Sequence, residues 1–318
     1  MPSESRSEPF VRRFVAAALT AGIIVSLTAC ATESPGSLAA ACETAAPDGN
    51  SSSTITASEE FGVKPEVSFP QPLIANQVQT SVLTQGDGKV VLSGQPVLVE
   101  ATILSGADGS VLQQTAYDQN GGSLFTLGDT ALPELGEGLK CIRVGSRVAV
   151  VAPAAQGEAE GADPAATVFV IDLIRAYKAK ADGADQIPQS GLPAVVTAPD
   201  GTPGITIPNE EAPTDFREAI LKKGTGDKIT ETSNVIAKYT SVEWGSKTVG
   251  ESTWSTGGAT ILSLDDTATV STGLRDTLVG QTIGSQVIAV IPPDRAGVGG
   301  QPAISTMVYV VDILGVIG

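Results

Sequence analysis

The cysteines, and the absence of histidine, limit the chemistry that this chain can perform. Its 318 residues include three cysteines and no histidine. Ser-His-Asp and Cys-His catalysis need an imidazole base, and His-ligated metal sites need the same ring, so all of these are excluded. The thiols of Cys30, Cys42 and Cys141 remain as candidates for covalent modification.

Cys30 ends an apolar run near the start of the chain. Arg12 and Arg13 precede this run, which covers residues 14–27. At about 1.5 Å per residue, a helix of that length is too short to cross a bilayer core comfortably. A basic start, a short apolar run and small residues at its end are typical of a signal peptide. The sequence LTAC at 27–30 resembles the bacterial lipobox, in which the cysteine is lipidated and becomes the first residue of the mature chain.

We therefore predict a lipoprotein signal peptide over 1–29 and a lipid anchor at Cys30, which holds the chain on the extracytoplasmic face of the cell membrane. An ordinary secretory signal with a chance cysteine is the alternative. The formal net charge of −16 at pH 7 argues against nucleic-acid binding, which needs a basic patch. It also argues against electrostatic docking on anionic lipid, so the acyl groups alone must hold the protein at the membrane.

Cys42 and Cys141 are the two cysteines that the lipid anchor leaves over. Outside the cytoplasm, two thiols can pair. From the predicted extracytoplasmic location alone, we predict a Cys42–Cys141 disulfide that connects the start of the mature chain to the folded part. Two free thiols, with Cys141 as a small buried hydrophobe, are the alternative.

A repeat organises the rest of the chain. Three segments recur at an offset of 138 to 140 residues, which is a constant register that chance similarity would not keep. The pairs are 67–88 with 205–226, 144–153 with 283–292, and 167–174 with 307–314. The chain therefore holds two copies of one domain, each of a common domain size.

The domain boundaries follow from this repeat and from composition. We place the first domain at 62–178 and the second at 204–318. Residues 179–203 are rich in proline, glycine and alanine, which predicts a linker. Residues 30–61 are small and polar, and we expect a disordered tether, because they bury too little apolar surface to offset chain entropy.

The periodicity of each copy predicts an α+β domain. Apolar residues alternate with period two over 97–103 and 234–242, as is typical of strands. One short helical window stands out in each copy, at 132–141 and 272–280, where leucines lie four residues apart. We therefore predict two tandem domains, each an antiparallel sheet wrapped on one short helix.

Five segments of the second copy follow the element order of a known family. They are AILKKGTGDKI (219–229), GESTWS (250–255), VSTGL (270–274), LVGQTIGSQVIAVIPPDRAG (278–297) and VYVVDIL (308–314). Together they resemble the FKBP-type peptidyl-prolyl cis-trans isomerase domain, and a fainter version covers 67–176. A leading cysteine followed by FGVKPEVSFPQP (61–72) is similar to the layout of tandem FKBP lipoproteins of Gram-positive bacteria.

The resemblance implies prolyl isomerisation in an apolar pocket, with no cofactor and no metal. Rotation about the peptide bond before proline has a barrier of about 18–20 kcal/mol. This barrier falls when the bond leaves water, because water stabilises the polar planar form more than the twisted transition state. The catalytic candidates are Tyr239, Glu251 in place of the family's aspartate, and Ser271 through its main-chain N–H. The substrate-binding candidates are Val270, Leu274, Gly297, Tyr309 and Trp254.

Several positions depart from the pattern of the family. Leu274 stands at the tryptophan floor, Gly250 at a wall phenylalanine and Gly297 at the flap tyrosine. In the first copy, Ala101 replaces the strand tyrosine and Leu135 the floor tryptophan. Losing aromatic area removes the surface that takes the imide out of water, so we predict weak activity, with the second copy as the candidate enzyme.

Three functions remain open at this point. The first is an isomerase, or rotamase, that assists folding of extracytoplasmic proteins and acts on proline-containing segments of secreted proteins. The second is a catalytically inactive FKBP-like binding module or holdase at the cell surface, and the third is a structural lipoprotein with no client. Ordinary core packing is the alternative for Tyr239, Tyr309 and Leu274, and a solvated carboxylate is the alternative for Glu251.

Overall fold

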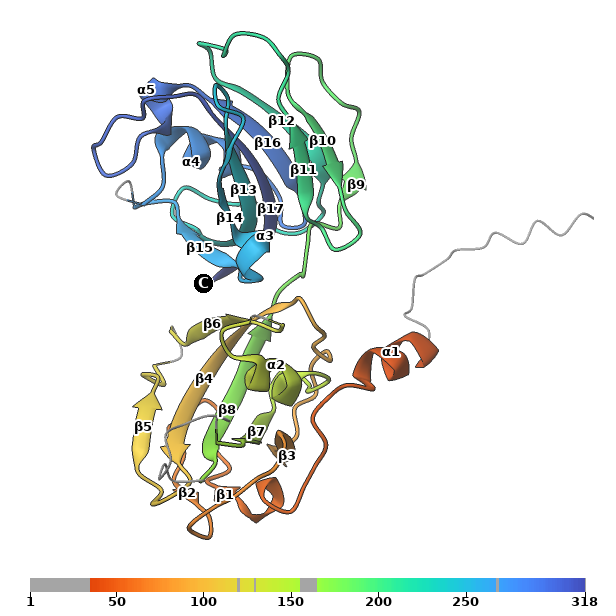
Figure 1. Ribbon diagram of the computed structural model, residues 1–318, viewed down its shortest axis with the longest axis vertical. Helices are drawn as coiled ribbons and strands as arrows, with labels where there is room; N and C mark the ends of the chain where they lie inside the picture. Colours follow the sequence, from red (N-terminus) through yellow and green to blue (C-terminus); the bar gives the residue numbers. More distant parts are fainter. Residues whose placement is uncertain (1–34, 119–120, 129, 155–164, 267–268, 318) are drawn as a thin grey trace, which may run out of the picture.

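The computed structural model describes residues 35–118, 121–128, 130–154, 165–266 and 269–317. The predicted signal peptide and the lipidation site Cys30 lie outside these residues. In the described part of the chain, no helix is both long and apolar enough to cross a bilayer. Two sheet-rich halves lie one above the other, an N-terminal half below and a C-terminal half above (Figure 1).

Six antiparallel strands form the sheet of the N-terminal half. In spatial order, the main path is β3 (Gln79–Thr84), β7 (Arg147–Ala152), β8 (Thr167–Ala176), β4 (Pro96–Ser105) and β5 (Val111–Gln114). Strand β6 (Ser123–Thr126) also pairs with β4. Helix α2 (Pro133–Leu139) packs on one face of this sheet, and its proline lies at the first turn, where the missing N–H breaks no helical hydrogen bond.

Seven antiparallel strands form the sheet of the C-terminal half. The main path is β14 (Val249–Ser252), β13 (Asn234–Glu243), β17 (Met307–Ile317), β16 (Gln286–Ile291), β12 (Arg217–Lys223) and β9 (Ala184–Asp185), and β15 (Thr260–Ser263) also pairs with β13. Three short helices accompany it: α3 (Thr253–Thr256), α4 (Thr272–Leu278) and α5 (Pro293–Ala296). Helix α4 begins at a side-chain cap, because the Oγ of Ser271 accepts the N–H of Leu274 at 3.2 Å.

The two sheets share one strand order. The path β3-β7-β8-β4-β5 corresponds to β12-β16-β17-β13-β14. In each half the sheet packs on one helix through two leucines that are almost fully buried, Leu135 and Leu139 in α2 and Leu274 and Leu278 in α4. The prediction of a sheet-rich chain with few helices is confirmed, and both of these helices lie inside the predicted windows.

The structure differs from the predicted tether over residues 30–61. From Pro35 onward the segment contains α1 (Pro35–Cys42), a 3-10 helix (Ser52–Thr54) and β1 (Thr56–Ala57), which pairs with β2 (Val67–Ser68). Ile55 packs in an apolar cluster under β7 and β8, and the buried hydroxyl of Ser52 lies 2.8 Å from the Oγ of Ser81. Contacts of this kind order a segment whose average composition suggests disorder.

A disulfide fixes the same segment to the N-terminal half. It joins Cys42, at the end of α1, to Cys141, just after α2, with the two Cα atoms 5.7 Å apart. Cys141 has a φ of 66°, in the left-handed region. The linker predicted over 179–203 also differs, because β9 lies within it, and β10 (Ala194–Thr197) forms a hairpin with β11 (Pro203–Thr206).

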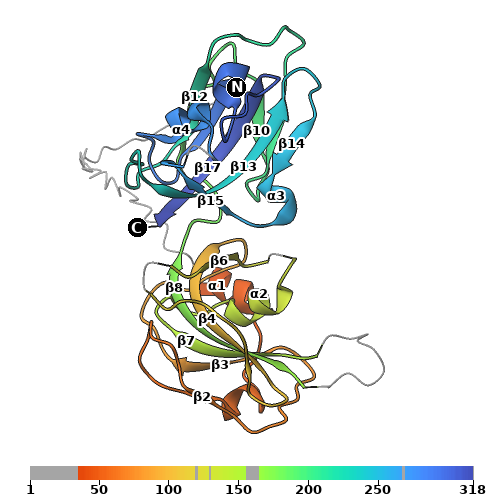
Figure 2. The ribbon, with the colours of Figure 1, turned by 90° about the vertical axis from the view of Figure 1, so that its left-hand side faces the viewer.

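The two halves meet over a small apolar cluster. Leu98 and Tyr177 of the lower half pack with Ile236 and Leu314 of the upper half. Gly315 lies against the Tyr177 ring, so closely that a Cβ there would fall 2.3 Å from the ring. Figure 2 shows β6 facing β15 across this junction, where the main-chain N–H of Ala259 donates to Thr126 in β6 at 3.0 Å.

Candidate functional site

Two tyrosines of the C-terminal half form the centre of the candidate site. Tyr239 lies on β13, and Tyr309 lies on the neighbouring strand β17, opposite Ser241. Residues two apart on a strand share a face, so both tyrosine side chains project from the same face of the sheet. Their ring centroids are 6.0 Å apart, with the ring planes tilted by 50°. The register of two central strands therefore builds one aromatic wall.

Glu251 supplies the charge beside this wall. It lies on the edge strand β14, where its main-chain N–H donates to the Oγ of Ser241 at 2.9 Å. Burial, followed by the neighbouring Glu251 carboxylate, raises the pKa of Tyr239. The same two causes raise the pKa of Tyr309. Both phenols are therefore neutral at physiological pH, and a hydrogen bond to Glu251 contributes to the raised pKa of Tyr239.

Val270, Ser271 and Leu274 bring the start of α4 to the same place. Val270 and Leu274 are buried in one cluster with Tyr239, and Tyr309 packs against that cluster. Ser271 is the residue before the helix, and in the described part of the chain its main-chain N–H has no hydrogen-bond partner. The sequence-predicted residues thus supply aromatic and aliphatic walls together with one unused backbone donor.

An open hollow lies at the side of this cluster. Its volume is about 390 Å³, and its lining residues are Val270, Thr272, Pro293, Asp294, Gly297, Gly300, Gln301 and Pro302. Two predicted substrate-binding residues, Val270 and Gly297, therefore line a cavity large enough for a proline ring. Tyr239 and Leu274 do not line it; both pack in the core cluster of this half, where Tyr239 is 9% and Leu274 is 5% exposed.

Trp254 lies apart from the other candidates. Its ring is 4.8 Å from the Nζ of Lys238, the residue before Tyr239 on β13. Successive residues of a strand point to opposite faces, so this tryptophan belongs to the face of the sheet that the tyrosine pair does not use. The sequence motif GESTWS (250–255) did not indicate which face of the sheet this tryptophan covers.

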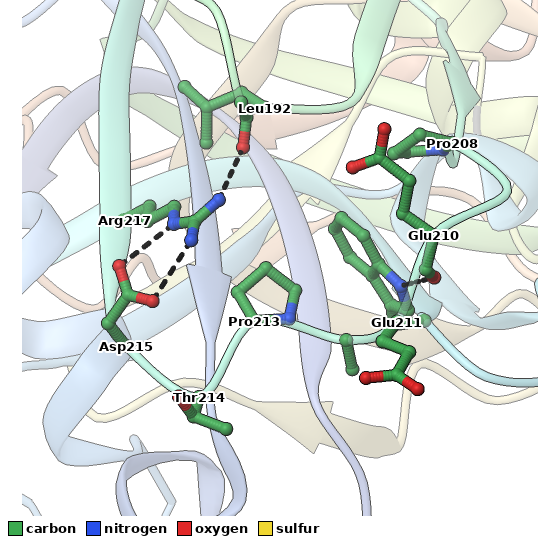
Figure 3. Close-up of a pocket in the computed structure, with 11 residues that line it drawn as sticks. Leu192, Pro208, Glu210, Glu211, Pro213, Thr214, Asp215 and Arg217 are labelled. Atoms are coloured by element: carbon green, nitrogen blue, oxygen red, sulfur yellow. Dashed lines mark hydrogen bonds and ion pairs between the residues drawn. The ribbon is translucent and has the colours of Figure 1, made fainter.

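A second hollow of the C-terminal half lies elsewhere and was not predicted. Figure 3 shows it, with a volume of about 480 Å³, between Pro208, Pro213 and Arg217. The guanidinium of Arg217 is already bound by Asp215, at 2.9 and 3.0 Å, and by the carbonyl of Gly191 at 3.1 Å. Its donors are therefore largely used within the chain, which makes this hollow a weaker candidate than the one beside Val270.

The N-terminal half lacks the tyrosine pair. At the positions equivalent to Tyr239 and Tyr309 stand Ala101 and Phe169, and Leu135 occupies the position of Leu274. Phe169 and Leu135 are buried in the core of this half. An alanine in the wall leaves no phenol to face a bound imide, which agrees with the choice of the second copy as the candidate site.

Comparisons with known proteins give only structural likenesses. No protein-family model matches the sequence, and no curated protein matches it. Solved structures of FKBP-type isomerases are similar to the chain. The three FKBP domains of wheat FKBP73 match at 20% identity and a TM-score of 0.30, covering 76% of this chain and 94% of that one.

Two bacterial structures are also similar to this chain. FkpA from Escherichia coli matches at 24% identity and a TM-score of 0.28, covering 39% of this chain and 51% of that one, so the match spans about half of FkpA. A peptidyl-prolyl cis-trans isomerase from Pseudomonas syringae pv. tomato matches at 24% identity and a TM-score of 0.27, covering 32% of this chain and 77% of that one. At such scores, function has to be argued from the residues of the site.

Proposed function

We propose that this protein is a tandem FKBP-like peptidyl-prolyl isomerase of low activity, with its catalytic site in the C-terminal half. The two FKBP-like domains would correspond to 62–178 and 204–318. The observation that carries the proposal is the convergence of Tyr239, Tyr309, Val270 and Leu274 beside a hollow, with the Glu251 carboxylate next to the phenols. Such a site offers apolar surface and neutral donors, which is what the reaction needs.

The reaction would proceed by removal of the imide from water. A proline ring bound against Val270 exchanges water for apolar surface, which favours the less polar twisted imide over the planar one. The unpartnered N–H of Ser271 is the donor that would hold the carbonyl before the proline. Neither a nucleophile nor a metal takes part in these steps, so a histidine-free chain can perform them.

The low activity follows from the composition of the walls. Leu274, at the floor, buries less flat area than a tryptophan would, and Gly250 supplies no side chain at a wall position. Each missing aromatic ring removes surface that would displace water from the imide. A catalytically inactive binding module or holdase is therefore the second candidate, favoured by the burial of Tyr239 and Leu274 within the core.

We place the protein on the extracytoplasmic face of the cell membrane, held by lipid at Cys30. The motif LTAC at 27–30 and the pairing of Cys42 with Cys141 support this location, because disulfides persist in oxidising compartments. The clients would be proline-containing segments of secreted proteins.

A prolyl-peptide isomerisation assay on the full chain tests the proposal. We expect acceleration above the uncatalysed rate and a loss of about tenfold in kcat/KM for Tyr239→Phe, which removes one hydrogen-bonding group from the site. Tyr177→Phe is the matched control, because the buried Tyr177 hydroxyl has no hydrogen-bond partner among the described residues and lies outside the site. A full chain no faster than the uncatalysed reaction excludes the isomerase, and retention of unfolded secreted protein on the immobilised chain would then identify the holdase.

A further inference from the structure

Glu100, in the N-terminal half, is a buried carboxylate with an unused oxygen. It lies on β4 and is only 2% exposed. Its Oε2 accepts the main-chain N–H of Tyr117 at 3.2 Å, whereas its Oε1 is buried with no hydrogen-bond partner among the described residues. Burying a charged oxygen without a partner is costly, so a group of this kind calls for an explanation.

The charges on the neighbouring strands do not compensate Glu100. Arg147, Asp172 and Glu100 stand side by side across β7, β8 and β4, because Asp172 pairs in register with both of the others. Arg147 is committed to Asp172 through two contacts, Nε to Oδ1 at 2.6 Å and Nη2 to Oδ2 at 2.7 Å. This buried row thus contains two carboxylates and one cation, and it lacks one positive charge.

The equivalent row in the C-terminal half is balanced. There Gln286, Asp312 and Lys238 occupy the three positions in the same register. The amide of Gln286 donates to Asp312 at 2.8 Å, and Lys238 supplies the cation where the N-terminal half has Glu100. The two halves therefore share one arrangement, but only the C-terminal half carries its own ammonium group at this position.

A cavity lies next to Glu100. Its volume is about 350 Å³, and its described lining residues are Phe61, Gly62, Glu100, Gly121 and Ile174. Glu100 is the one charged group among them, and Phe61 and Ile174 provide apolar walls. Phe61 is 36% exposed, so the cavity lies close to the surface.

The turn that carries Phe61 and Gly62 is held in place by the same charge row. The N–H of Gly62 donates to Oδ2 of Asp172 at 2.6 Å, and Arg147 donates to the carbonyls of Ser58 and Val63. Backbone and side chain thus build this wall of the cavity with hydrogen bonds inside the protein. The backbone of this wall is therefore fixed within the fold.

We propose that this cavity binds a cation carried on an aliphatic stem, either a primary ammonium or a guanidinium, with Glu100 as its counter-ion. The charged end supplies the missing positive charge of the row, and the stem packs on Ile174 and Phe61, whose ring face also attracts a cation. The net charge of −16 raises the local concentration of such ligands around the protein. The site lies in the other half from the isomerase site, so it stands or falls independently of that proposal.

Binding of n-butylammonium to the full chain, measured by calorimetry and by NMR shifts of residues 61–62 and 174, tests the site. We expect affinity for this probe to fall about tenfold or more in Glu100→Gln, which keeps the shape but removes the charge. Glu60→Gln is the matched control: it removes the same charge from an exposed neighbour of Phe61 and should leave affinity unchanged. Uncharged n-butanol should bind at least about tenfold more weakly than the ammonium.

A second variant keeps the test decisive if Glu100→Gln folds poorly. Glu100→Lys copies the C-terminal half, so it should fold with a higher unfolding midpoint and lose n-butylammonium binding. Equal affinity in the unsubstituted chain and in both Glu100 variants overturns the proposal. Equal binding of n-butanol and n-butylammonium overturns it as well, because the cavity would then be merely apolar.

A further comparison distinguishes two sources of the bound cation, a basic side chain of a polypeptide and a small free amine. The peptide acetyl-Ala-Lys-Ala-amide and its norleucine counterpart differ only in the ammonium group. If the lysine peptide binds in a Glu100-dependent way, the cavity takes basic side chains of polypeptides. If n-butylammonium alone binds, the site takes small free amines. If neither probe binds, the proposal is wrong.

Discussion

Arg147 and Asp172 form a fully buried ion pair, with Nε and Oδ1 2.6 Å apart and no exposed side-chain area on either residue. The same guanidinium holds the turn before β2 through the carbonyls of Ser58 and Val63. One side chain therefore connects the sheet of the N-terminal half to the segment that leads into it.

Arg147→Met should destabilise the protein by about 3–5 kcal/mol, because it leaves the Asp172 carboxylate buried without a cation. The free energy of unfolding in urea is the measurement. Gln286→Met, at the equivalent position of the other half, removes a neutral donor and should cost about 1–3 kcal/mol. Equal losses in the two variants would show that the charge of Arg147 adds nothing to its hydrogen bonds.

The Cys42–Cys141 disulfide closes a loop with a sequence separation of 99. Replacing both cysteines by serine should lower the free energy of unfolding of the N-terminal half by up to about 4–5 kcal/mol, because the unfolded chain regains the entropy of that loop. Adding a reductant to the unsubstituted protein should give the same loss and should leave the double variant unchanged. A reductant effect of similar size in both proteins would contradict this account.

All four tyrosines of the chain have raised pKa values, chiefly through burial, and that of Tyr117 reaches about 12. A phenol whose pKa is higher in the folded state stabilises the fold fully below the unfolded value of about 10, and that contribution is lost as the pH rises through the folded value. Absorbance at 295 nm should therefore show little tyrosinate at pH 10 and then a rise together with unfolding. Half-ionised phenols in a folded protein at pH 10 would refute this prediction.

The isomerase rate should not depend on pH between about 6 and 9. The chain has no histidine, and the raised pKa of Tyr239 keeps its phenol neutral throughout this range. Catalysis by desolvation moves no proton, whereas general acid-base catalysis gives a bell-shaped profile. The measurement is kcat/KM for a prolyl peptide across this range, and a bell-shaped profile would indicate a proton-transfer mechanism instead.

Gly315→Ala should destabilise the junction of the two halves by about 1–3 kcal/mol, because the new Cβ would fall 2.3 Å from the Tyr177 ring. Gly204→Ala is the control: the nearest atom to its added Cβ is 3.5 Å away, and its effect on unfolding should stay below about 1 kcal/mol. Urea unfolding of both variants is the test. Equal effects would mean that the ring moves aside freely.

The sequence by itself determined the repeat, the strand-rich character of both copies and the positions of α2 and α4. These follow from local periodicity: alternation marks strands, and leucines four apart mark a helix with one apolar face. The sequence also indicated four residues as site candidates, because the segments that contain them resemble those of a known family. These residues are Tyr239, Tyr309, Val270 and Leu274.

Only the tertiary structure decided which of these residues are exposed and what lies beside them. Trp254 belongs to the opposite face from Tyr239, and the cavity opens beside Val270 and not over Leu274. Residues 35–61 are ordered by one disulfide and a few buried groups, which average composition does not reveal. The unbalanced row at Glu100 became visible only through strand register. The physical reason is the same throughout: burial and charge pairing depend on contacts between residues far apart in the chain, and local patterns carry no information about those contacts.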